Sequence, residues 1–338
     1  MKKLRVLAFM HEDLVPPESM KGLSDKERED LRTEYDVVSS LAAMGHEVRT
    51  VGVRNDLAPL GSVIEEWKPE IAFNILEEFH GKATNDYLVV SYLELMNVPY
   101  TGCNPRGLIL ARDKALSKKL LAYHRIRVPD FAVFPAGKKV KRPKKLGYPL
   151  IVKSLVEEAS LGIAQASLVD NDEKLAERVQ FIHENIGTDA IAEKFIEGRE
   201  LYVSVLGNQR LQVLPVWELL FTNMPPDAPL IATAKIKWDK TYQKKRGIES
   251  GAAKNLPPGI DEKVQRISKR IYRILELTGY AHLDYRLSPE GELYFLEANP
   301  NPQVARGEDM ADSALAAGIS YEAMLQKILN IGLKRNGR

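Results

Sequence analysis

Apolar runs alternate with amphipathic and polar segments through the first hundred residues. Residues 11–30 are polar and contain Pro16-Pro17, so we expect irregular structure there. Strands that alternate with helices indicate a parallel sheet with helices on its faces. Residues 1–104 are therefore predicted to form one α/β domain. Its expected strands are 3–10, 47–53, 69–76 and 98–103, and its expected helices are 31–44, closed by Gly45, and 85–97.

Beyond residue 104 the pattern changes to a mixture of long helices and β-rich segments. A basic, proline-rich connection at 138–149 is best interpreted as a solvated linker. Segments 150–155 and 162–169 are predicted to be strands around a small loop, and 190–219 is β-rich. Helices are predicted at 105–123, 171–186, 260–279 and 320–335.

Two alternating segments, AHLDYRL and ELYFLEANPNP, are joined by Ser-Pro-Glu-Gly at 288–291. A four-residue hairpin loop there would pair Tyr285 with Tyr294 and His282 with Glu297. Since side chains alternate along a strand, two sets of side chains face opposite ways. We expect one face to carry His282, Asp284, Arg286, Leu293, Phe295 and Glu297, and the other to carry Leu283, Tyr285, Tyr294 and Leu296.

The first of these faces has the chemistry of a metal site. Asp284 would lie diagonal to Glu297, and Asn299 would continue the same side past the strand end. Two carboxylates and an amide oxygen are hard ligands that suit a divalent cation such as Mg2+ shared with a phosphate. Scattered charge on a solvated face is the alternative, but Glu297 lies between Leu296 and Ala298 in an apolar run.

Composition limits the class of protein. The 338 residues are enough for two or three domains, and a formal net charge of +2 argues against a general nucleic-acid binder. The single cysteine, Cys103, excludes an intrachain disulfide and suits a reducing compartment. No apolar run approaches the roughly 18 residues needed to cross a bilayer. We therefore expect a cytoplasmic protein with no membrane partner.

The usual phosphate-loop and dinucleotide motifs are absent, and no spaced Cys/His set indicates zinc. In LIVKSLVEEASLGIAQA, Lys153 ends an apolar strand and Ser160 and Gly162 lie in a small-residue turn that could bind phosphate. An ordinary hairpin with a surface lysine explains that segment equally well. In AEKFIEGREL, Glu193 and Glu200 flank an apolar pair, for which a charged edge strand is the better interpretation in isolation.

The order of these segments resembles the ATP-grasp superfamily. A lysine-bearing helix (ARDKALSKKLL) precedes the lysine strand with its small-residue loop, then EKFIEGRE, and finally LDYRL with LYFLEANPNP. More narrowly, residues 69–303 resemble the D-alanine–D-alanine ligase-like branch, most strongly at FLEANPNP. The resemblance implies an α/β ATP-grasp fold. An N-terminal parallel-sheet α/β domain (1–104) would precede two α+β lobes (105–192 and 193–338) that enclose the nucleotide.

The resemblance also implies roles for individual residues, with ATP and Mg2+, or alternatively Mn2+, as cofactors. Lys114 and Lys153 would contact the nucleotide phosphates, aided by the turn at Ser160 and Gly162. The metal ligands would be Asp284, Glu297 and Asn299. Adenine would lie against Glu193 and the backbone of Lys194, Phe195 and Ile196, the ribose against Glu200, and Lys237 of KIKWDK would belong to a loop that closes over the phosphates.

Three departures from the family pattern leave the substrate open. His282 stands where the ligases have an arginine that stabilises the tetrahedral intermediate, so His282 is expected to act when protonated, or Arg286 to replace it. Glu158 and Ala159 stand where the ligases favour glycine and serine. The segment that binds the first D-alanine is not recognisable in FMHEDLVPPESMKGL.

The resulting hypothesis is an ATP-dependent carboxylate–amine ligase that forms an amide or peptide bond through an acyl phosphate, with amino acids or peptides as substrates. D-Alanyl-D-alanine synthesis and ligation of a different amino acid or peptide are the two enzymatic versions. A non-catalytic ATP-binding module is the alternative from another class, and three magnesium ligands argue against it. The family likeness also implies a homodimer.

Overall fold

The computed structural model describes residues 2–157, 161–224, 231, 233, 236 and 239–335. It begins with the predicted parallel sheet, whose strand order is β2-β1-β3. The strands are β1 (Arg5–His11), β2 (Glu47–Val53) and β3 (Ile71–Asn74). The helices around this sheet are α1 (Asp25–Asp30), α2 (Arg32–Ala43), α3 (Ala58–Trp67) and α4 (Asp86–Leu95), with short 3-10 turns at Glu12–Leu14 and Ala83–Asn85.

Two predictions for this domain are wrong. The fourth strand expected at 98–103 is only an isolated bridge between Ala72 and Tyr100. Pro99 has no N–H to donate, and the Asn74 N–H bonds the hydroxyl of Thr101 at 2.9 Å instead of a backbone carbonyl. The supposedly irregular segment 11–30 contains α1, which begins with a capping box between Ser24 and Glu27.

The long helix expected at 105–123 is two helices, α5 (Pro105–Arg112) and α6 (Lys114–Tyr123). Asp113 separates them because its backbone is extended, with φ −80° and ψ 101°. Its carboxylate accepts hydrogen bonds from the N–H groups of Ala115 and Leu116 at 2.9 and 2.8 Å, which caps α6. The break fixes where Lys114, the first residue of α6, points.

A four-stranded antiparallel sheet follows, in the order β4-β7-β5-β6. Its strands are β4 (Phe131–Phe134), β5 (Leu150–Ser154), β6 (Leu168–Val169) and β7 (Ala190–Lys194). Helix α7 (Asp172–Phe181) and the π-helical turn η4 (Ile182–Ile186) pack on it through a small apolar core. Of the strand predicted at 162–169, only β6 forms, because a 3-10 turn occupies Gln165–Ser167.

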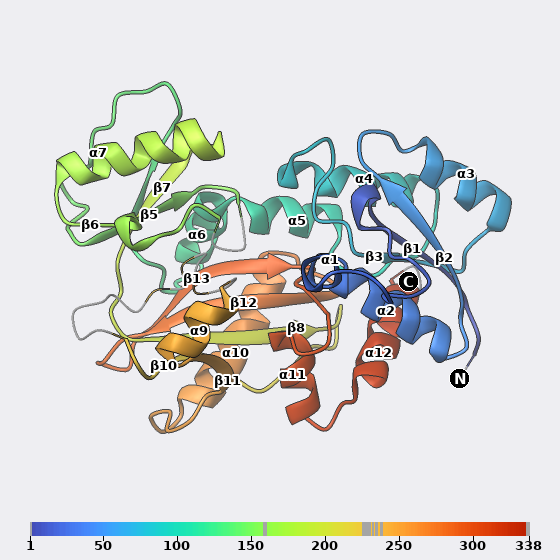
Figure 1. The fold of residues 1–338 in the computed structure, drawn as a ribbon. Coiled ribbons are helices and arrows are strands. Elements are labelled where there is room, and N and C mark those ends of the chain that lie inside the picture. The colour runs from blue at the N-terminus through green and yellow to red at the C-terminus, as the bar shows by residue number, and fades with distance from the viewer. Residues whose placement is uncertain are drawn as a thin grey trace.

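The second antiparallel sheet is larger, with the order β11-β10-β8-β12-β13 and β9 beside β8. Its strands are β8 (Arg199–Leu206), β9 (Gln212–Val213), β10 (Trp217–Phe221), β11 (Ile248–Ala252), β12 (Tyr280–Leu287) and β13 (Leu293–Pro300). Helix α9 (Lys240–Arg246) precedes β11, and α10 (Ile260–Ile274) covers the apolar face of the sheet. Figure 1 shows α6 between this sheet and the four-stranded one.

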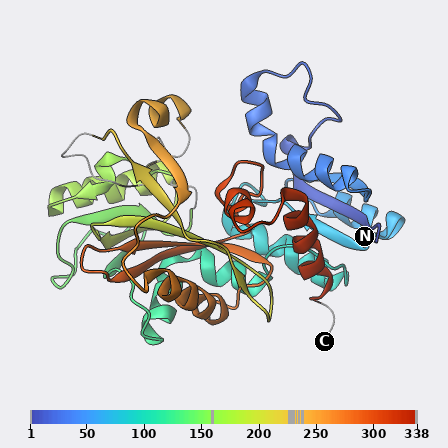
Figure 2. The same ribbon diagram turned by 90° about the horizontal axis from the view of Figure 1, so that it is seen from below.

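The chain ends with α11 (Asp309–Ala316) and α12 (Tyr321–Leu333), which pack on the N-terminal domain. Met324, Leu325 and Ile328 of α12 share an apolar cluster with Val6 and Phe73 of the N-terminal sheet. Figures 1 and 2 both show α12 beside that domain. None of the helices in the described ranges is long and apolar enough to cross a membrane.

The hairpin formed by β12 and β13 does not have the predicted register. The loop has five residues, 288–292, so Tyr285 pairs with Phe295 and Leu287 with Leu293. All four of these side chains are buried in the core, which places Phe295 and Leu293 on the apolar face and not with Asp284 as predicted. Tyr294 pairs with Arg286, opposite to the predicted face.

A β-bulge then reverses the alternation. The register shifts between Asp284 and Tyr285, so that Leu296 is an extra residue on β13. Asp284 therefore pairs directly with Glu297, and His282 pairs with Asn299. The predicted diagonal relation of Asp284 to Glu297 and the pairing of His282 with Glu297 are wrong. The two carboxylates nevertheless share a face, because the longer loop and the bulge each shift the alternation by one residue.

Candidate active site

The site begins with a row of three cross-strand pairs between β8 and β12. Glu200 lies opposite Arg286, Tyr202 opposite Asp284, and Ser204 opposite His282. Alternation puts these polar residues on one face while Leu201, Val203 and Val205 enter the core. One end of the row is the ion pair between the Arg286 guanidinium and the Glu200 carboxylate, at 2.8 Å.

Each member of the row is held by a further contact. The Tyr202 hydroxyl donates to Glu200 Oε1 at 2.8 Å, and the Arg286 guanidinium donates to the Gly198 carbonyl at 2.9 Å. His282 Nδ1 lies 3.0 Å from the Ser204 hydroxyl, and its Nε2 lies 3.8 Å from Asp284 Oδ1. Both nitrogens of His282 are thus oriented along the row.

The next strand adds Glu297 and Asn299 to this face. Asn299 Nδ2 donates to Asp284 Oδ2 at 3.3 Å, and because a carboxylate only accepts, this contact fixes the amide orientation. Asn299 Oδ1 is buried and has no hydrogen-bond partner among the described residues. An acceptor left in this position beside two carboxylates fits a hard cation.

The set of protein ligands for such a cation is small. Within the part of the chain that the structure describes, no three His, Cys, Asp or Glu side chains are grouped to hold a metal ion. Asp284, Glu297 and Asn299 supply two carboxylates and one amide oxygen. Mg2+ is commonly bound by one or two carboxylates together with substrate phosphates and water, so these residues fit a cation that arrives with a phosphate ligand.

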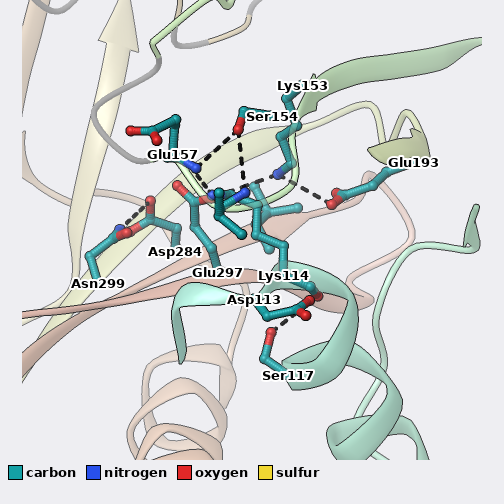
Figure 3. A network of polar contacts seen from close by, with 12 residues as sticks. Asp113, Lys114, Ser117, Lys153, Ser154, Glu157, Glu193, Asp284, Glu297 and Asn299 are labelled. Carbon is teal, nitrogen blue, oxygen red and sulfur yellow. Dashed lines mark hydrogen bonds and ion pairs between the residues drawn. The ribbon is translucent and has the colours of Figure 1, made fainter. Parts of the chain in front are cut away.

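Two lysines lie close to Glu297 on the side away from Asp284 (Figure 3). Lys114 Nζ lies 3.4 Å from Glu297 Oε2 and donates to the Glu157 carbonyl at 2.5 Å. Lys153 Nζ lies 3.8 Å from the same oxygen and 3.3 Å from Glu193 Oε1. Burial alone would lower the pKa of Lys153, but the carboxylates of Glu193 and Glu297 outweigh it and raise the pKa. The two carboxylates therefore favour the charged form of Lys153.

Glu193 is completely enclosed, with 1% of its surface exposed. Burial opposes its ionisation, but the ammonium groups of Lys118 and Lys153 outweigh burial and hold the pKa of Glu193 below its usual range. Lys118 Nζ lies 2.9 Å from Glu193 Oε1, and burial lowers the pKa of Lys118 to about 8. Buried charges are stable only when paired in this way.

Two cavities meet at Asp284. The smaller, of about 60 Å³, is lined by Lys153, Glu200, Arg286 and the backbone segment 193–196. The larger is an open cleft of about 1740 Å³ between the N-terminal domain and the second antiparallel sheet. His282 and Asn299 line the cleft, and Asp284 lines both cavities. The face with Asp284 and Asn299 therefore lies between a charged pocket and a wide cleft.

The structure brings most of the predicted site residues together. Those around the small cavity and its lysines are Lys114, Lys153, Glu193, Lys194, Phe195, Ile196, Glu200, Asp284, Arg286 and Glu297. Gly162 lies in a turn with φ 72°, and its carbonyl accepts from Arg178, while the next residue, Ile163, lines the small cavity. The predicted residues Ser160 and Lys237 lie outside the described residues.

Three site residues escaped the sequence analysis. Lys118 lies one helical turn after Lys114, and that i, i+4 spacing was the available signal. Tyr202 and Ser204 follow Glu200 at intervals of two in RELYVSVL, so strand alternation would have put them on the face of Glu200. Neither pattern identifies a site until the elements that pack against α6 and β8 are known.

Comparison with known proteins gives consistent matches over nearly the whole chain. Residues 120–330 match the family model described as D-ala D-ala ligase C-terminus. A D-alanine–D-alanine ligase of Desulforudis audaxviator is 30% identical over 320 residues, which is 94% of this chain and 97% of that protein.

Solved structures agree on the architecture. The crystal structure of the D-alanine–D-alanine ligase from Bacillus anthracis complexed with ATP has a TM-score of 0.74 at 23% identity, covering 98% of both chains. That of the VanG D-Ala:D-Ser ligase from Enterococcus faecalis has a TM-score of 0.71 at 19% identity, covering 98% of this chain and all of the other. At these identities the structural similarity establishes the fold alone. That fold is the ATP-grasp fold predicted from the sequence.

Proposed function

Because the chain belongs to the D-alanine–D-alanine ligase family, we propose that it is an ATP-dependent ligase that joins a carboxylate to an amine. The observation that best supports this function is the meeting of the two cavities at Asp284. There a pair of facing carboxylates and a buried amide oxygen adjoin a pocket with Lys153 and a wide cleft. This arrangement suits the transfer of a phosphoryl group from a nucleotide on one side to a substrate on the other.

In this proposal ATP occupies the small pocket. Glu193 and the backbone of 194–196 hold adenine, Glu200 holds the ribose, and Lys114 and Lys153 contact the phosphates. The pocket adjoins the wide cleft at Asp284, which lines both, so the phosphates would extend from the pocket towards the cleft. Asp284, Glu297 and Asn299 are the residues that would hold Mg2+, and a cation there would offset the negative charge that develops during phosphoryl transfer.

The reaction has two balanced steps. An oxygen of the substrate carboxylate attacks the γ-phosphorus of ATP, the bond to the β,γ-bridging oxygen breaks, and an acyl phosphate and ADP form. The amine then attacks the acyl carbon, loses a proton, and expels inorganic phosphate to leave an amide. Lys114 and Lys153 offset the repulsion between the two anions that the first step brings together.

His282 and Arg286 take different parts in this scheme. Arg286 contacts Glu200 and the Gly198 carbonyl, so its role is to position Glu200, the residue proposed to bind the ribose. His282 faces the cleft and is oriented by Ser204. We propose that His282 contacts the reacting acyl group where the related ligases have an arginine.

The lining of the cleft favours a substrate other than two alanines. His11, Asp13 and Leu14 line it, and they belong to a segment in which the family's D-alanine motif is not recognisable. We therefore propose that one substrate is a different amino acid or a short peptide. D-Alanyl-D-alanine synthesis is the alternative.

The assay that tests the function follows phosphate release from Mg-ATP. Single and paired D- and L-amino acids and short peptides are the candidate substrates. Glu297→Gln should abolish the stimulated release, whereas Glu290→Gln, on the exposed loop of the same hairpin, should leave it within about twofold. ATP binding without stimulation by any substrate would favour a non-catalytic module.

We also propose a cytoplasmic location, which suits the use of ATP and the single buried thiol of Cys103. A homodimer, which the family likeness implied, is a proposal that the mass of the protein in solution would test.

A further inference from the structure

The β-bulge at Leu296 is what puts both carboxylates on one face. Without the extra residue, pairing would continue from Tyr285–Phe295 to Asp284–Leu296 and Leu283–Glu297. Leu283 is fully buried in the core, so Glu297 would be directed into the apolar interior. The proposed metal face therefore depends on the bulge.

A bulge leaves the backbone of its extra residue outside the regular ladder. Here the ammonium group of Lys118 donates to the carbonyl of Leu296. Lys118 is on α6, with no exposed surface, and its second partner is Glu193 of β7 at 2.9 Å. One side chain thus joins α6 to both antiparallel sheets at the point where the strand alternation changes.

The same helix also holds the next residue of β13. Lys114, one turn earlier on α6, lies 3.4 Å from the Glu297 carboxylate. Asp113 caps the first turn of α6, so the positions of both lysines follow from the orientation of one short helix. Lys118 contacts the backbone of the bulge, whereas Lys114 contacts the side chain that the bulge directs.

We propose that Lys118 is a positioning residue that stabilises the bulge at Leu296 and so directs Glu297 to the metal face. This inference rests on the proposed function, because it concerns the same metal site. A carbonyl in a bulge has no ladder partner to fix it, and a buried charged donor makes a hydrogen bond stronger than a neutral one. Loss of that donor frees β13 locally and weakens the metal site without removing any metal ligand.

The test compares Lys118→Met with Lys119→Met, its exposed neighbour on α6. Mn2+ affinity of the protein–ATP complex is measured by electron paramagnetic resonance, and ATP affinity without metal by calorimetry in EDTA. Replacing a residue that holds a metal ligand in place typically costs 10- to 100-fold in metal affinity. We expect at least a tenfold loss of Mn2+ affinity in Lys118→Met and a smaller loss of metal-free ATP affinity, because Glu193 keeps Lys153 as a partner. Lys119→Met should change neither.

Hydrogen exchange in metal-free protein gives a second readout. Amides of 296–298 should exchange faster in Lys118→Met than in Lys119→Met, while those of β8 stay protected. If Lys118→Met does not fold, Lys118→Gln is tested in its place. The glutamine side chain is one bond shorter than that of lysine, and its amide is a neutral donor. At least a threefold loss of Mn2+ affinity is then expected.

Wild-type Mn2+ affinity in a folded Lys118 variant would overturn the inference. So would an equal loss in Lys119→Met, or a loss of ATP affinity as large as the loss of metal affinity. Failure of the proposed function is distinguishable, because it would appear in the wild-type protein, either as no binding of Mn2+ with ATP or as no phosphate release with any substrate.

Discussion

The charged side chains of the site occur in a fixed sequence of contacts, from Lys118 to Glu193, Lys153 and Glu297. Glu193 and Glu297 each have a lysine within 4 Å, so charges that would be costly alone are held in the interior. Glu193 and Lys153 were singled out in the sequence because acids or lysines beside apolar runs are unusual. Lys118 was not, since a lysine in a helix is ordinary until its burial is known.

Glu34 on α2, which is not one of the proposed site residues, should make the free energy of unfolding depend on pH. Only 4% of its surface is exposed, and burial raises the pKa of its carboxyl from 4.5 to about 7. Between these values the folded state keeps a proton that the unfolded state releases, so the free energy of unfolding falls as pH rises from about 4.5 to 7. Above pH 7 the penalty is constant.

Replacing Glu34 by glutamine should remove this pH dependence. We expect Glu34→Gln to be more stable than the wild type by up to about 3 kcal/mol at pH 8 and nearly equal to it at pH 4.5. Urea unfolding across this pH range measures the difference, with Glu65→Gln on the exposed side of α3 as the control. A constant difference at every pH would contradict the account.

At the scale of elements, the start of α6 connects a helix cap to nucleotide binding. Asp113→Ala removes the cap and should lower the free energy of unfolding by about 1 kcal/mol. It should also weaken ATP binding, because Lys114 is the first residue of the helix. Asp113→Asn keeps a capping oxygen and should retain most of both.

Calorimetric ATP titration and urea unfolding of the two Asp113 variants measure these effects. Equal ATP affinities in Asp113→Ala and Asp113→Asn would show that the cap does not control the position of Lys114.

The hairpin illustrates how far the sequence predicts local structure. Alternation and the run LEANPNP were enough to identify Asp284, Glu297 and Asn299 as neighbours. The register was wrong because a loop of five residues and a bulge are set by packing against β8 and α6, which alternation within the hairpin does not encode. The break at Asp113 was not predicted, because a single aspartate inside an otherwise helical pattern is a weak signal for a cap.

At the scale of the whole molecule, the alternation of strands and helices predicted the N-terminal sheet, and the order of motifs predicted the ATP-grasp fold. The return of α12 to the N-terminal sheet was not predicted, because an amphipathic helix does not specify which core it covers. The division at residues 104 and 192 stays a proposal.

The N-terminal domain meets the second antiparallel sheet through closely approaching backbone. A Cβ on Gly279 would lie 2.1 Å from the Gly102 carbonyl oxygen, and Gly279 has φ +72°. Gly318 has a similar φ of +76° with nothing near its Cβ position. The two glycines thus separate the cost of backbone conformation from the cost of the clash.

Alanine at Gly318 should cost about 1–2 kcal/mol of unfolding free energy for its left-handed conformation. Alanine at Gly279 should cost about 1–3 kcal/mol more, because backbone must move to admit the methyl group. Chemical denaturation of both variants measures the difference. Equal losses would mean that the two domains can separate there without cost.

In the proposed reaction ATP phosphorylates a carboxylate of the substrate, and an amine then attacks the acyl carbon and displaces inorganic phosphate. The most direct measurement uses the amino acid or peptide that gives the fastest phosphate release, labelled with 18O in its carboxylate. Mass spectrometry of the inorganic phosphate then reports the origin of its fourth oxygen. We predict one 18O atom in each phosphate released; phosphate without label would mean that water attacks ATP and that the protein is not a ligase of this kind.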